Sequence, residues 1–128
     1  MKKMLLLSLI STILLASCNK DKRELSIKGK WTVDNFGYKE YVNNTLTSTT
    51  TAPGDGTALD FQDNGNVVIT FTMGPPESYP YKLITDTKVE FDGETYEIRN
   101  LTATSVTLFA REDFAPGEYD ELSINLKK

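Results

Sequence analysis

The feature that most restricts the fold of this chain is a repeated alternation of apolar and polar residues between short turns. Val67, Ile69 and Phe71 alternate with valine and threonine, and no segment after Lys28 keeps a helical period over ten or more residues. Side chains with period two project from alternate faces of a β-strand. The pattern therefore predicts an all-β domain over residues 28–128.

Glycine, proline, asparagine and aspartate interrupt the alternation at close intervals. Asp92-Gly93 is a strong hairpin signal, and Asn64-Gly65 marks a second hairpin. Short connections join antiparallel strands, because parallel strands need long crossovers. The sequence predicts an antiparallel meander of eight or nine strands closed into a small barrel, which leaves no sheet edge unpaired. A two-sheet β-sandwich is the alternative.

One stretch departs from this regular pattern. Residues 43–57 are polar and rich in threonine, and they end in Ala52-Pro53-Gly54-Asp55-Gly56. Threonine favours β-structure, so a weak strand fits at the start, and the end is predicted as loop. If the barrel encloses a cavity, we expect this stretch to form its rim or lid. Residues 73–77 are a second candidate for the rim.

The beginning of the chain has a different character. Lys2 and Lys3 precede an apolar run from Leu5 to Ala16, which is too short to cross a membrane, since a spanning helix needs about 20 apolar residues. A basic start, a short apolar run and small residues at its end are typical of a secretory signal peptide. The sequence predicts a signal peptide over residues 1–17.

Leu15-Ala16-Ser17-Cys18 resembles a lipobox, the recognition site of the lipoprotein signal peptidase. The resemblance implies cleavage before Cys18 and a thioether-linked diacylglycerol on its sulfur. Cys18 is also the only cysteine in the chain. Two or three acyl chains anchor a protein firmly, at ~0.8 kcal/mol for each buried CH₂. We expect Cys18 to be the lipid attachment site of an envelope lipoprotein; the alternative is an ordinary secretory signal that ends near a cysteine.

Residues 18–27 are interpreted as the lipidated cysteine and a charged tether. Asn19 stands where enteric inner-membrane lipoproteins carry a retention aspartate, so we expect the protein to be anchored in the outer membrane. The sequence does not distinguish the periplasmic face of that membrane from the surface face. Lys20-Asp21-Lys22-Arg23-Glu24 loosely resembles the charged surface-export signals of some anaerobic Gram-negative lipoproteins. A solvated tether explains the same residues equally well.

The composition excludes several kinds of chemistry. The chain has no histidine and, after Cys18, no cysteine. It therefore cannot assemble a Ser-His-Asp or Cys-His nucleophile, or an ordinary zinc site. Once Lys2 and Lys3 are removed, 12 basic residues face 18 acidic ones, whereas nucleic-acid binders normally carry a basic patch. We expect a protein that is not an enzyme, with no cofactor, no metal and no nucleic-acid partner.

Gly29-Lys30-Trp31 stands at the start of the first predicted strand and resembles the G-x-W signature of lipocalins. Leu59-x-Phe61 and Tyr81-x-Leu83 are similar to small lipocalin-like lipoproteins of anaerobic Gram-negative bacteria. The resemblance covers roughly residues 27–126 and implies a lipocalin-like barrel. Typical lipocalins are longer and usually end in a helix, for which this chain has no room.

The same resemblance assigns roles to several side chains. Gly29 and Trp31 are fold markers, because the lipocalin tryptophan closes the bottom of the barrel. The resemblance to lipocalins also implies an arginine packed on Trp31 by a cation–π contact, for which Arg99 and Arg111 are both candidates.

Aromatic residues on the predicted strands are candidates for the barrel interior. A small eight-stranded barrel holds either packed side chains or one small ligand. The first hypothesis is a membrane-anchored module that binds a small apolar ligand in the barrel. The alternative is a non-enzymatic envelope interaction protein with a filled core, whose partner is a protein, such as a hydrolase that it inhibits, or a glycan. The expected ligand-binding residues are Phe61, Phe71, Tyr79, Tyr81, Phe91 and Tyr96.

Two acidic segments are interpreted as structural. Residues 60–66 lack the ligand spacing of an EF-hand calcium loop and fit a turn. Glu90, Asp92 and Glu94 surround a predicted hairpin. Because Glu90 alternates with apolar neighbours, we expect the three carboxylates to point outward to solvent rather than to form a glycosidase pair.

Overall fold

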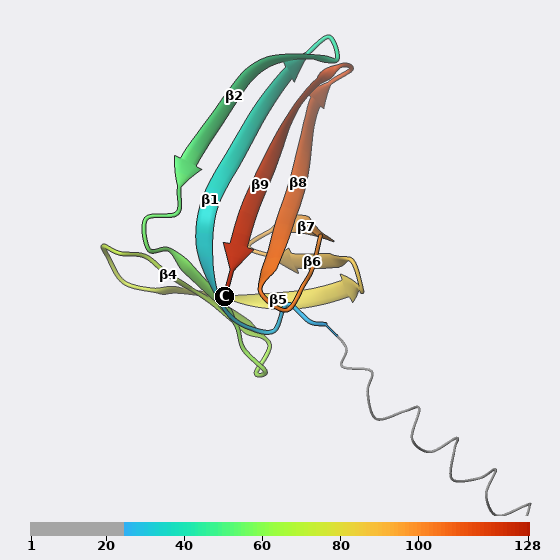
Figure 1. Cartoon of the computed structure of the whole chain (residues 1–128). Helices are drawn as coiled ribbons and strands as arrows, with labels where there is room; N and C mark the ends of the chain where they lie inside the picture. Colours follow the sequence, from blue (N-terminus) through green and yellow to red (C-terminus); the bar gives the residue numbers. More distant parts are fainter. Residues whose placement is uncertain (1–24) are drawn as a thin grey trace, which may run out of the picture.

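A computed structural model of the protein describes residues 25–128, and these residues form nine β-strands and no helix (Figure 1). The predicted signal peptide, Cys18 and most of the predicted tether lie outside the described residues. The described residues contain no helix that could span a membrane. The strands are β1 (Gly29–Val42), β2 (Thr45–Pro53), β3 (Ala58–Phe61), β4 (Asn66–Thr70), β5 (Glu77–Thr85), β6 (Lys88–Phe91), β7 (Glu94–Arg99), β8 (Ser105–Ala115) and β9 (Glu118–Lys127).

The strands form a closed barrel. β1 pairs with β3, each strand from β3 to β9 pairs with the next, and β9 pairs again with β1. Every pairing is antiparallel. The predicted all-β barrel is therefore confirmed, and the sandwich alternative is wrong. Closure satisfies the backbone groups of both outer strands of the meander, which is why so short a chain needs no covering helix.

β2 is the additional, ninth strand and lies outside the closed barrel. It pairs only with β1, from Asn35 to Val42, while the beginning of β1 pairs with β3. Figure 1 shows that β2, β1, β9 and β8 rise together beyond the short strands of the barrel. We call this extension the long-strand sheet: residues 35–42 of β1, all of β2, residues 110–115 of β8 and residues 118–125 of β9.

The expectation of a long rim or lid loop is wrong for residues 45–53, because these residues form β2. Asn43 and Asn44 have positive φ angles of 52° and 60°, and Val42 pairs with Thr45 across them. Asparagine tolerates this conformation, so the pair makes a two-residue hairpin turn. The threonine-rich segment then continues as a strand, because β-branched residues suit a pleated surface.

The core lies within the barrel and is centred on the first strand. Trp31 and Ile27 are each 1% exposed, and the indole Nε1 of Trp31 donates a hydrogen bond to the carbonyl oxygen of Ile27 at 2.7 Å. The sequence predicts that Ile27 belongs to the tether, yet its side chain is packed in the core. The fully buried side chains are Trp31, Phe61, Ile27, Leu108, Val67 and Val89.

The expectation that an arginine packs on the ring of Trp31 is wrong. Lys128 lies there instead, with Nζ 4.4 Å from the ring centroid of Trp31. Arg99 packs over Phe109 and Arg111 over Tyr119. The reason is strand alternation: both arginines are on the outer side of their strands, whereas Trp31 points inward.

Candidate ligand-binding site

Five of the six predicted ligand-binding aromatics are brought together, and the rings of four of them, all but Tyr79, pack against one another. Phe61 lies edge-on to Tyr81 and to Phe91, with ring centroids 5.2 Å and 5.7 Å apart. Phe91 stacks on Tyr96 at 4.7 Å. Phe61, Phe91 and Tyr96 are buried, and Tyr79 and Tyr81 pack at the edge of the cluster. These rings fill the space that they were expected to line.

The two tyrosine hydroxyls at the edge of this cluster have partners within the protein. Tyr81 donates to the carbonyl oxygen of Gln62 at 2.8 Å, and Tyr79 donates to Glu77 at 2.6 Å. The hydrogen bond with Glu77 raises the pKa of Tyr79 to about 12. Phe71, the sixth predicted residue, follows the end of β4 and is 38% exposed, so it does not join the others.

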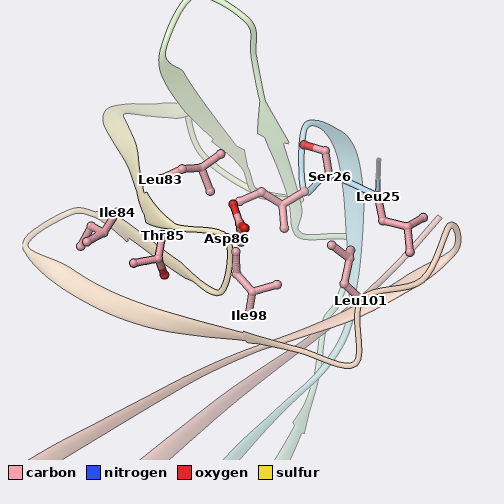
Figure 2. A pocket seen from close by; sticks show the side chains of 9 residues that line it. Leu25, Ser26, Leu83, Ile84, Thr85, Asp86, Ile98 and Leu101 are labelled. Atoms are coloured by element: carbon pink, nitrogen blue, oxygen red, sulfur yellow. The ribbon is translucent and has the colours of Figure 1, made fainter. Parts of the chain in front are cut away.

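A pocket of about 580 Å³ opens at the end of the barrel where the chain enters (Figure 2). We call it the barrel mouth. It is built from the residues that precede β1, the end of β5 with its following turn, β7 and the segment after β7. Its lining residues are Leu25, Ser26, Ile27, Leu83, Ile84, Thr85, Asp86, Ile98 and Leu101.

Strand alternation places two of the lining side chains. Leu83 follows Tyr81, and Ile98 follows Tyr96, in each case two residues along the strand, so both point to the inner side of the barrel. Leu83 is nevertheless 41% exposed, because it stands beyond the packed core. Ile27 lines the barrel mouth and also belongs to the core, so its side chain forms the floor between them.

The lining of the barrel mouth combines aliphatic side chains with polar groups. Leucine and isoleucine supply six of the nine lining residues, and Asp86 is the only ionisable one within the described part of the chain. The volume falls in the range of about 300–1,000 Å³ that is usual for pockets that bind small molecules. A period of two relates Leu83 to Tyr81 and places both on one face of a strand, but it does not assign Leu83 to a site. No sequence pattern identifies Leu25 or Leu101 as lining residues.

The long-strand sheet carries two smaller hollows. One, of about 230 Å³, includes Gly37, Lys39, Phe109 and Glu121 among its lining residues, which share the face that points away from the core. Gly37 lies opposite Ser123 at the bottom of this hollow. A Cβ atom on Gly37 would be 3.7 Å from the Cβ of Ser123, and its absence keeps this part of the hollow open.

The other hollow, of about 120 Å³, is acidic. Tyr38 donates a hydrogen bond to Asp120, which raises the pKa of the Tyr38 hydroxyl to about 12, and Glu94 and Glu112 lie beside this pair. The expectation that Glu94 points outward is wrong, because Glu94 is in phase with the inward Tyr96. Across the described part of the chain, no group of three or more His, Cys, Asp or Glu is placed to hold a metal ion.

Comparisons with known proteins leave the family open: no family model, no curated protein and no solved structure matches the chain. The class that the fold defines is a small antiparallel β-barrel protein with one additional strand, consistent with a lipocalin-like barrel.

Proposed function

We propose that this protein is a lipid-anchored binding module of the cell envelope that is not an enzyme and holds a small apolar ligand at the barrel mouth. The observation that carries the proposal is the pocket of about 580 Å³ with mainly leucine and isoleucine walls. The ligand lies at the mouth and not deeper, because the rings around Phe61 fill the interior.

The proposed anchor supports a ligand of this kind. Cys18 precedes Leu25, at the rim of the barrel mouth, by seven residues. An extended chain spans at most ~3.3–3.6 Å per residue, so a lipid on Cys18 holds the pocket within about 25 Å of the membrane surface. An apolar molecule that leaves or enters the membrane therefore has a short path to the site.

Two measurements test the proposal. Native mass spectrometry of residues 19–128, purified gently from the host, is expected to show a small molecule that is lost on denaturation. The Leu83→Asn variant, which places a neutral polar group in an exposed wall of the mouth, is expected to lose it, whereas Leu46→Asn on β2 retains it. Labelled palmitate is expected to enter the full-length protein but not its Cys18→Ser variant. If every preparation shows only the mass of the protein without a bound molecule, the ligand-binding part of the proposal is wrong.

A second candidate function rests on β2. This strand forms the edge of the long-strand sheet, and none of its nine residues is charged. Natural proteins usually protect an edge strand with charges, bulges or a cover, because its free backbone groups pair readily with another strand. An extended segment of an envelope protein could add to β2 through its backbone.

This candidate is tested by a photo-crosslinking residue in place of Thr49, introduced in the host. A partner crosslinked there and absent when the residue replaces Glu90, on the outside of the barrel, supports an interaction protein. Equal labelling from both positions contradicts it.

A further inference from the structure

The barrel mouth has apolar walls on two sides. Figure 2 shows Leu25 and Leu101 on one side of the pocket and Leu83 and Ile84 on the other, with Ile98 between them. Its volume of about 580 Å³ lies in the lower half of the range for pockets that hold one small molecule. This arrangement suits a single alkyl chain between the two walls.

The polar side chains that line the barrel mouth include two neutral hydroxyls and one negatively charged carboxylate. Ser26 and Thr85 offer hydroxyls, and Asp86, in the turn between β5 and β6, offers a carboxylate. Among residues 25–128, Asp86 makes no ion pair, and no basic residue lines the pocket.

Within residues 25–128, the lysines that neighbour the lining segments along the chain are directed elsewhere. Lys82 and Lys88 alternate with the inward Leu83 and Val89, so they lie on the outside of the barrel. The ammonium of Lys28 lies 3.6 Å from a carboxylate oxygen of Asp63. Among the described residues, an anionic group in the mouth would thus meet a carboxylate and no lining cation.

We propose that the barrel mouth selects a single-chain amphiphile whose polar end is cationic or uncharged and disfavours one whose polar end is anionic, with Asp86 as the residue that sets this preference. The inference rests on the proposed ligand site and adds the chemical class of its ligand. The alkyl chain contacts the leucine and isoleucine walls, and the polar end lies beside Asp86 at the open side.

Three probes of equal chain length test this preference: dodecylamine, monododecanoylglycerol and dodecanoate. Their affinities for residues 19–128 are measured by calorimetry at low salt, below the concentrations at which the probes form micelles. The amine is expected to bind about two- to tenfold more tightly than dodecanoate, because a solvent-exposed charge pair contributes little. The glycerol ester is expected to lie between them, and added salt is expected to reduce the spread.

Asp86→Asn keeps a turn-forming residue and removes the charge, so it is expected to bring the amine-to-dodecanoate ratio close to one. Glu90→Gln removes a charge from the outside of the barrel and serves as the matched control, with the ratio unchanged. Equal loss in both variants would mean that the overall acidity of the protein, and not Asp86, attracts the amine, and it would overturn the proposal. Thermal unfolding of both variants checks that they are folded.

The remaining outcomes separate the inference from the proposed function. Dodecanoate binding as tightly as the amine, with all probes lost in Leu83→Asn, would leave the apolar site intact and overturn the role of Asp86. The absence of binding by all three probes would overturn both the site and its preference.

Discussion

Replacing Ile27 by alanine tests whether this residue, two positions before β1, belongs to the core or to the tether. Ile27 is 1% exposed, and its carbonyl oxygen accepts the indole hydrogen bond of Trp31. The change removes three carbons from a packed site, a transfer cost of about 2.4 kcal/mol at ~0.8 kcal/mol for each. The cavity that remains adds to this, so we expect a loss of about 2–4 kcal/mol in the free energy of unfolding.

Urea unfolding of residues 19–128, followed by the fluorescence of Trp31, measures this loss. With a slope of about 2 kcal/mol per molar urea, the midpoint is expected to fall by about 1–2 M. Leu25→Ala is the matched control: Leu25 is 57% exposed, and its loss should change stability by no more than about 0.5 kcal/mol. If Ile27→Ala behaves like Leu25→Ala, Ile27 belongs to the tether and the floor of the barrel mouth is misassigned.

Three further predictions concern other contacts. Trp31→Phe leaves the buried carbonyl of Ile27 without its donor and should cost about 1–3 kcal/mol in urea unfolding followed by circular dichroism; an unchanged midpoint would contradict the role of this hydrogen bond. The pKa of Tyr38 is raised to about 12 from 10, so the folded state holds this proton more tightly and stability should fall as pH rises from 10 to 12, less so in Tyr38→Phe; equal slopes in the two proteins would refute this. Thr49→Lys should change stability by less than about 0.5 kcal/mol yet remove any partner that pairs with β2, as judged by crosslinking from a neighbouring position; a partner that persists does not use this edge.

Local sequence signals predicted the hairpins well. Asp92 and Gly93 both have positive φ angles, as the predicted turn requires, and Gly65 has a φ of 88° in the other predicted hairpin. Such signals work because the conformation of a two-residue turn depends on its own residues. The turn at Asn43-Asn44 was missed, although its residue types tolerate positive φ, because the polar threonines after it do not alternate with apolar residues.

The candidate site was predicted less well. Five of the six predicted aromatic residues lie near one another, but period two does not distinguish a side chain that lines a cavity from one that fills it. Glu94 illustrates a related difficulty. Its charge favours an outward, solvated side chain, but it lies two residues before the inward Tyr96 and therefore points to the same inner side.

Local sequence patterns indicated the strands of the closed barrel and most of its tight turns, because the pleat and the turn conformations are properties of neighbouring residues. The tertiary structure sets three further features: β9 closes on β1, β2 extends the sheet beyond the barrel, and Ile27 becomes a floor. It also decided that Leu25, Leu83 and Leu101 meet around one pocket. These contacts join residues far apart in the chain, and pairing and packing at such separations depend on the whole barrel rather than on any local pattern.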